Sequence, residues 1–242
     1  MRFRSLVFTI LSVFLLSSIS YGASVTGTVK YQGEAPKFKA IKMDADPVCL
    51  SHHEGDVFPQ TLILGEGGTM ADVFVHVTGG LASQAYPTPA ESVVLDQKGC
   101  MYDPHVAAVM VNQEIKIMNP DGTLHNVHAT PKINEEFNLA MPKFRTEVSQ
   151  KFTKAESMIP LKCDVHPWMI GWVNVMEHPF FSVTRADGKF EIKNLPAGKY
   201  EIEAWHEKLG TQKFTVEVAE GDTKTLDITF SRPEKAEAAA TN

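Results

Sequence analysis

The chain has 242 residues, of which 43% are hydrophobic and 21% charged, so it can build one large domain or two small ones around a sizeable core. It carries 29 acidic and 23 basic residues, for a formal net charge of −6. This acidic balance argues against binding to nucleic acid or to anionic membrane surfaces.

Residues 1–22 have the pattern of a secretory signal peptide. Arg2 and Arg4 precede an apolar run over residues 6–16, and small residues follow at the cleavage point. The run is shorter than the roughly 20 apolar residues that a membrane span needs, and an uncleaved N-terminal anchor is the alternative. No later stretch of the sequence is long and apolar enough to cross a membrane. We therefore expect a periplasmic or secreted protein with no membrane span after cleavage.

The chain after residue 22 is typical of strands rather than helices. Short runs of alternating apolar and polar residues are separated by Gly, Pro, Asn and Asp. These runs are 25–29, 73–77, 114–118, 173–175, 190–192, 200–205 and 214–218. The segment 133–154 lacks clear alternation, which favours a helical turn or a long loop, and 233–242 is typical of a disordered tail. The pattern predicts an all-β protein built from antiparallel sandwiches or barrels.

Several histidines are candidates for a metal site. His125 and His128 lie in one strand-like run, where they point to opposite faces, so both cannot be in-plane ligands of the same site. His105 follows a proline in another strand-like segment and is expected to be structural, with a metal contact as the alternative. His52 and His53 could form a further weak site, but the residues after them indicate a solvated loop.

The run 163–169 combines Cys163, His166 and Met169 in a C-x-x-H-x-x-M pattern. Soft sulfur beside neutral imidazole suits copper, and two histidines, one cysteine and a weak axial methionine form a blue-copper site for electron transfer. A C-x-x-H pair alone fits zinc as readily. The alternative for the methionine is packing in the core. The loop predicts a copper site that takes its second histidine from upstream.

The sequence has three cysteines, Cys49, Cys100 and Cys163. In an oxidising compartment an odd count leaves one thiol to be protected or used. If Cys163 binds copper as a thiolate, Cys49 and Cys100 can form a disulfide. Two buried free thiols are the alternative.

Residues 91–178 resemble a cupredoxin, and the ligand loop with the His-Asn-Val-His run is most similar to the amicyanins of that family. The segments that carry the resemblance are 102–106, 119–128, 163–169 and 171–175. It implies a Greek-key sandwich with one type 1 copper bound by His125, Cys163, His166 and Met169. It gives Asn126 the role of bracing the cysteine loop by hydrogen bonding. It also implies a redox protein partner that docks on apolar surface near Trp168 and His166.

Residues from 186 onward resemble a carboxypeptidase-regulatory-like, transthyretin-type sandwich, on the segments 187–190 and 194–200. That family opens with a Gly-x-Val strand, and the match to it lies far upstream, at 24–29. The resemblance implies that the cupredoxin is inserted in this second sandwich, whose two parts are 23–90 and 179–232. Tandem packing in one continuous sheet system is the alternative.

These features predict a blue-copper protein that carries single electrons. A copper storage or chaperone protein and a structural binding module are the alternatives. We do not expect an enzyme, because a four-ligand site has no open position for a substrate and no Ser-His-Asp or paired-carboxylate arrangement stands out.

Overall fold

The computed structural model describes residues 22–232 of the chain. The expected signal peptide, except for its last residue, and the expected tail at 233–242 lie outside the described residues. Within them, no helix has the length and apolar character that crossing a membrane requires. Nearly all regular structure in this part of the chain is β-strand, which confirms the predicted all-β class.

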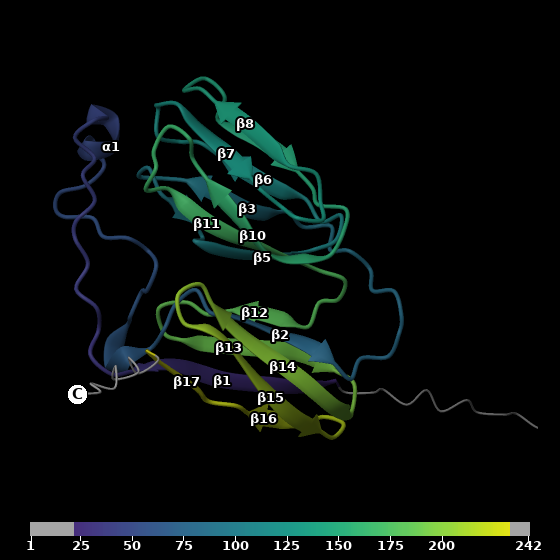
Figure 1. Ribbon diagram of the computed structural model, residues 1–242. Coiled ribbons are helices and arrows are strands. Elements are labelled where there is room, and N and C mark those ends of the chain that lie inside the picture. Colours follow the sequence, from purple (N-terminus) through teal and green to yellow (C-terminus); the bar gives the residue numbers. More distant parts are fainter. Residues whose placement is uncertain (1–21, 233–242) are drawn as a thin grey trace, which may run out of the picture.

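The middle of the chain forms a β-sandwich, here called the central sandwich (Figure 1). One sheet has the strand order β5-β11-β10-β7-β8, and the other has the order β4-β3-β6-β9. The strands are β3 (Val93–Gln97), β4 (Tyr102–Asp103), β5 (Val106–Met110), β6 (Ile115–Met118), β7 (His125–Ala129), β8 (Phe137–Met141), β9 (Glu147–Gln150), β10 (Glu156–Lys162) and β11 (Ile170–Met176). Alternate residues of these strands, such as Ile115 and Ile117 on β6, fill a shared apolar core between the sheets.

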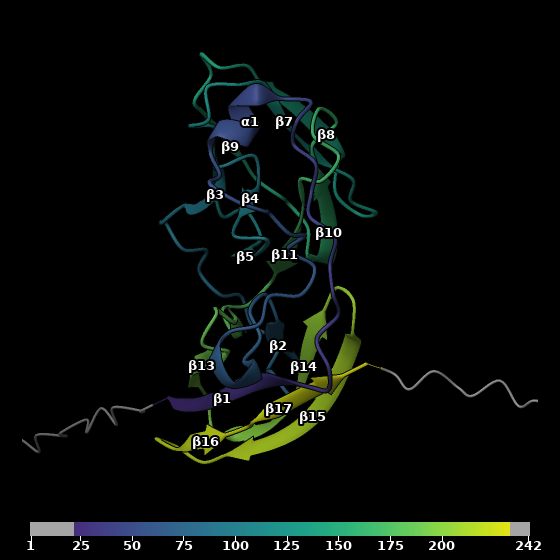
Figure 2. The same ribbon diagram turned by 90° about the vertical axis from the view of Figure 1, so that its left-hand side faces the viewer.

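Strands from before and after the central sandwich together form a second one, here called the flanking sandwich (Figure 2). Its sheets have the orders β13-β1-β16, with β17 also paired to β1, and β12-β2-β14-β15. The strands are β1 (Ala23–Gln32), β2 (Phe74–Gly79), β12 (Phe181–Val183), β13 (Lys189–Leu195), β14 (Gly198–His206), β15 (Gly210–Val218), β16 (Thr223–Thr225) and β17 (Ile228–Ser231). Val25 of β1 pairs with Ile192 of β13, so each sheet joins chain segments from both sides of the central sandwich.

The segment 41–57 packs on the central sandwich. The expectation that all of 23–90 belongs to the flanking sandwich is corrected for this segment. It contains the short helix α1 (Pro47–Ser51), and its Met43 and Cys49 are buried in the central core. Figure 1 shows α1 beside the central lobe, reached by two extended stretches of chain. The segment forms no strand, and its buried residues and the disulfide of Cys49 hold it on the central sandwich. The short helix η1 (Glu66–Gly68) then precedes β2.

The segment 133–154 contains two strands, so the expectation of a helical turn or a long loop was wrong. Phe137, Leu139 and Met141 of β8 turn inward, while Asn138 and Ala140 turn outward. The apolar alanine on the exposed face hid this alternation in the sequence. β8 and the short, half-exposed β9 are both edge strands.

The two sandwiches meet through a small buried cluster of apolar residues. Its buried members are Phe74, Val106, Met176 and Trp205. The rings of Trp172 and Trp205 contact edge to face, with centroids 5.3 Å apart. Glu207 accepts hydrogen bonds from His105 Nε2 (2.9 Å) and from Trp172 Nε1 (3.1 Å). His105 therefore has a structural role between the sandwiches, as expected.

Candidate metal centre

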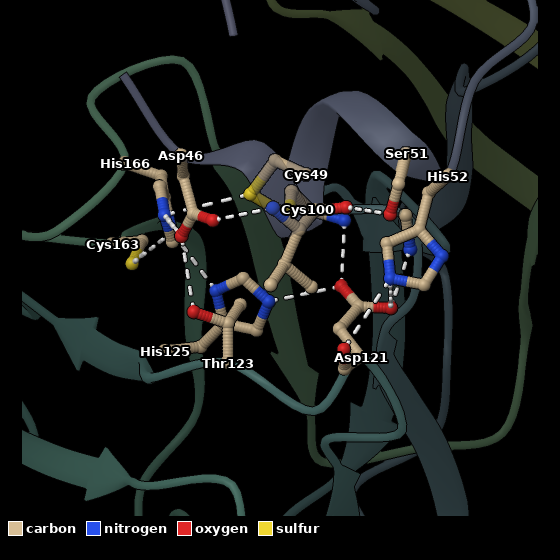
Figure 3. The surroundings of a disulfide bond; sticks show 12 residues. Asp46, Cys49, Ser51, His52, Cys100, Asp121, Thr123, His125, Cys163 and His166 are labelled. Carbon is tan, nitrogen blue, oxygen red and sulfur yellow. Dashed lines mark hydrogen bonds and ion pairs between the residues drawn. A yellow bond between two sulfur atoms is a disulfide. The ribbon is translucent and has the colours of Figure 1, made fainter. Parts of the chain in front are cut away.

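Three of the four predicted ligands meet at one end of the central sandwich (Figure 3). His125 begins β7, and Cys163 and His166 come from the loop between β10 and β11. The Nδ1 atoms of the two histidines are 3.0 Å apart, and Cys163 Sγ is 3.8 Å from His166 Nδ1. All three side chains are buried.

The β10–β11 loop is closed by its own backbone. The N–H of Cys163 donates to the carbonyl of Met169 (3.0 Å), and the N–H of Met169 donates to the carbonyl of His166 (2.9 Å). Met169 is fully buried in the central core. These bonds give the loop one compact shape, while the axial role of the Met169 thioether stays a prediction.

Asn126 connects β7 to this loop. Its Oδ1 accepts the N–H of Asp164 (2.8 Å) and lies 3.4 Å from Cys163 Sγ. These are the contacts of a residue that braces the cysteine loop, the role expected for it. His128 bonds instead to Asp164 (2.9 Å) and Glu136 (2.8 Å), and it lies outside the ligand group.

The outer nitrogen of each histidine faces a carboxylate, which sequence reasoning missed. His125 Nε2 is 2.9 Å from Asp121 Oδ2, and His166 Nε2 is 3.0 Å from Asp46 Oδ2. A signal for Asp121 existed, because it lies in the turn just before β7. Asp46 is 120 residues from its histidine, and no periodicity connects the two.

A disulfide lies beside these contacts. Cys49 and Cys100 are joined, with their Cα atoms 5.5 Å apart, and they are the pair that the cysteine count left for a disulfide. Cys49 Sγ is 3.5 Å from His166 Nε2, and the N–H of Cys100 donates to Asp121 Oδ2 (2.7 Å). The disulfide therefore ties α1 to the backbone that holds the other carboxylate.

His52 and His53 attach the end of α1 to neighbouring loops. His53 Nε2 is 2.8 Å from the carbonyl oxygen of Gly99, and His52 Nε2 is 3.4 Å from that of Asp121. In the described part of the chain, neither belongs to a group with metal-ligand geometry. His52 and residues 54–56 are exposed, as expected of a solvated loop.

The protonation of the metal-free site follows from burial and from its own contacts. Burial lowers the pKa of His125, but Asp121 and Cys163 outweigh this and raise that pKa to about 9. Burial raises the pKa of the Cys163 thiol, but its contacts with His125 and with backbone N–H groups outweigh this and lower the pKa. Burial lowers the pKa of His166. The arrangement favours a thiolate on Cys163, the form in which cysteine binds metals.

The residues present fit a soft metal ion. Two nitrogens that each bind the same ion at about 2.0 Å, at a near-tetrahedral angle, lie about 3.3 Å apart. The two Nδ1 atoms are 3.0 Å apart, which is close to that value. With Nε2 of each histidine held by a carboxylate, Nδ1 is the nitrogen left to bind. Two imidazoles and one thiolate form a donor set that copper favours. Two further donor groups in the described residues use Cys49 or Cys100, whose sulfurs are already in the disulfide.

The surface over the site differs from expectation. A partner was expected to dock near Trp168 and His166, but His166 is only 2% exposed because α1 and the disulfide cover it. Trp168 is half-buried, and its Nε1 donates to the carbonyl of Cys100 (3.0 Å). Leu50 of α1, Val165 of the loop and Leu124 directly before His125 are large apolar side chains that are exposed, at 55%, 44% and 43%.

A comparison with known protein families matches part of the flanking sandwich. Residues 176–231 match the family model of the carboxypeptidase regulatory-like domain, which covers β12–β17 of the flanking sandwich. This part of the chain is similar to that family. A search of the curated proteins found no match.

Solved structures similar to the chain include cupredoxins. An oxidised amicyanin variant is 22% identical over 40% of this chain and 96% of that one, with a TM-score of 0.32. A reduced amicyanin variant is 25% identical over 42% of this chain and 97% of that one, with a TM-score of 0.31. A copper-containing nitrite reductase from Thermus scotoductus SA-01 is 20% identical over 41% of this chain and 26% of that one, with a TM-score of 0.32.

Proposed function

We propose that this is a periplasmic or secreted type 1 copper protein that carries single electrons between redox partners. The observation that carries the proposal is that three buried atoms, His125 Nδ1, His166 Nδ1 and Cys163 Sγ, lie close enough together to bind one metal ion. Copper, when bound, takes up and releases one electron. Met169 is proposed as the weak axial ligand, on the chemistry of its thioether and its place in the loop.

The chain contributes a rigid and dry setting for this chemistry. His125 sits on a strand in the interior of its sheet, and the loop that carries Cys163 and His166 is fixed by backbone hydrogen bonds and by Asn126. Donors held from two sides move little when the metal changes its oxidation state. Burial of all three keeps water from the thiolate.

A closed set of four ligands leaves no coordination position for a substrate, so the proposal is a carrier and not an enzyme. A redox protein would approach this end of the central sandwich. With His166 covered, its contacts would be with Val165, Pro167 and the outer face of α1 around Leu50. Such a surface suits a small, transient interface.

An absorption spectrum of the purified protein with Cu(II) tests the proposal. We expect an intense visible thiolate-to-copper band and a reversible one-electron wave in voltammetry. Cys163→Ser should abolish the band, because a hydroxyl cannot replace the covalent copper–thiolate bond. His128→Asn is the matched control, since His128 lies close by but outside the ligand group, and it should keep the band. A wild-type protein without the band that binds zinc more tightly would contradict the proposal and favour a storage or structural site.

A further inference from the structure

The carboxylate that contacts His166 belongs to a segment outside the two sheets of the central sandwich. The segment 41–57 brings Asp46 to the outer face of the ring, where Asp46 Oδ2 lies 3.0 Å from His166 Nε2. The His166 side chain is 3% exposed and that of Asp46 is 20% exposed. A hydrogen bond from a histidine N–H to a carboxylate is charge-assisted, and shielding from water strengthens it.

Asp46 is itself held from two further directions. Its Oδ1 accepts the N–H of Val48 (2.8 Å) at the start of α1, and its Oδ2 accepts the hydroxyl of Thr123 (3.0 Å). Thr123 lies in the turn that leads into β7, so the same carboxylate contacts both sides of the site (Figure 3). The disulfide from Cys49 to Cys100 fixes α1 to the central sandwich, so the aspartate cannot move away with its helix.

We propose that Asp46 is a positioning residue of the copper site, which fixes the His166 ring with Nδ1 toward the metal and makes it a stronger electron donor. The proposal rests on the proposed function. A carboxylate partner on the far nitrogen sets the tautomer and raises the basicity of a metal-binding imidazole. A stronger donor stabilises Cu(II) more than Cu(I), so Asp46 should lower the reduction potential.

Asp121 makes the corresponding contact with His125, but it is less suited to a test. Its carboxylate is buried and also accepts the N–H groups of Gly99 (2.8 Å) and Cys100 (2.7 Å). An asparagine there would leave a buried backbone donor without an acceptor and could prevent folding. Asp46 is the better position, because asparagine starts a helix as well as aspartate does.

The experiment measures the potential and the visible band of Asp46→Asn. In the variant one amide oxygen replaces two carboxylate oxygens, so the charge is lost and the oxygen accepts either the N–H of Val48 or that of His166. We expect full copper content, an unchanged band, and a potential raised by about 59 mV, which is a tenfold change in the equilibrium between the oxidation states. Asp44→Asn is the matched control: Asp44 is exposed on the same segment, and the same charge is removed without a contact to His166. It should shift the potential by less than a third as much.

Equal shifts of the potential in Asp46→Asn and Asp44→Asn would overturn the proposal, because they would show only a long-range effect of charge. A lowered or unchanged potential in Asp46→Asn would overturn it as well. Nitrogen NMR of the metal-free protein gives a second, independent readout. We expect the His166 proton on Nε2, protected from exchange in the wild type and exchanging quickly in Asp46→Ala. A proton on Nδ1 in the wild type would refute the positioning role even if the blue band is present. A wild type without the band but with the protected Nε2 proton would refute the proposed function alone.

Discussion

At the scale of single residues, the two histidines of the site are held at both ring nitrogens. The Nδ1 atoms face each other and the cysteine, while the Nε2 atoms face Asp121 and Asp46. The inner donors are soft and suit copper. The outer carboxylates keep the rings from rotating when no metal is bound. The donor set is therefore prepared before binding, which is the arrangement expected of a site that changes oxidation state with little movement.

Replacing Met169 by glutamine tests the axial ligand. A thioether is a poor donor to Cu(II), whereas an amide oxygen is harder and stabilises it, so Met169→Gln should keep copper and lower the potential. A drop on the order of 100 mV would correspond to about 2 kcal/mol between the oxidation states. Voltammetry measures the effect. Met158→Gln, at a half-exposed methionine on β10, is the control and should change nothing. A potential that stays the same or rises in Met169→Gln would leave Met169 as a packing residue only.

At the scale of elements, the short helix α1 makes several of the contacts that shape the candidate metal site. It covers His166, supplies Asp46 at its start and bonds covalently to the central sandwich through Cys49. A helix of five residues is not stable by itself, so its position depends on these attachments. The disulfide is the attachment that a mutation can remove without replacing a predicted ligand.

Removing the disulfide should destabilise the protein and loosen α1. A disulfide between cysteines 51 positions apart is worth about 4 kcal/mol in the free energy of unfolding, by the loop-entropy estimate. The double variant Cys49→Ala, Cys100→Ala should lose that amount in urea unfolding. Hydrogen exchange should rise in 41–57 but not in β10 or β11. Unchanged protection of 41–57 would mean that apolar packing alone holds the segment.

At the scale of the whole molecule, the chain crosses between two sandwiches several times. The flanking sandwich combines β1 and β2 with strands that follow the central one, so neither core is complete until both ends of the chain are in place. Glu207, at the end of β14, links the two by accepting from His105 and Trp172. Stability of the molecule is therefore sensitive to buried polar groups near this junction.

His206, next to that glutamate, should make stability depend on pH. Burial is the main cause that lowers its pKa from 6.5 to about 4; the neighbouring His105 and Lys208 side chains act in the same direction, and Glu207 opposes them. The unfolded chain takes up the proton at the higher value, so the stabilisation is complete above pH 6.5 and is lost as the pH falls toward 4. The loss should reach about 3 kcal/mol in the free energy of unfolding.

Urea unfolding at several pH values between 7.5 and 4.5 measures this dependence. Carboxylates also titrate at the acid end of the range, so the decisive quantity is the difference from His206→Gln, which has no proton to take up. The variant should lose less stability over the same interval. An identical pH dependence in both proteins would contradict the assignment to His206.

Some of these features could be predicted from the sequence alone. The alternation of strands predicted the all-β class, because a residue's face in a sheet follows from its position in the strand. The spacing of Cys163, His166 and Met169 predicted their common loop, because neighbours in a short loop stay neighbours in space. The tertiary structure alone decided that α1 leaves its own sandwich, that Asp46 reaches His166 and that His166 is covered. These contacts join residues 51 to 120 positions apart. Packing and disulfides between such distant segments leave no periodic pattern in the sequence from which they could be predicted.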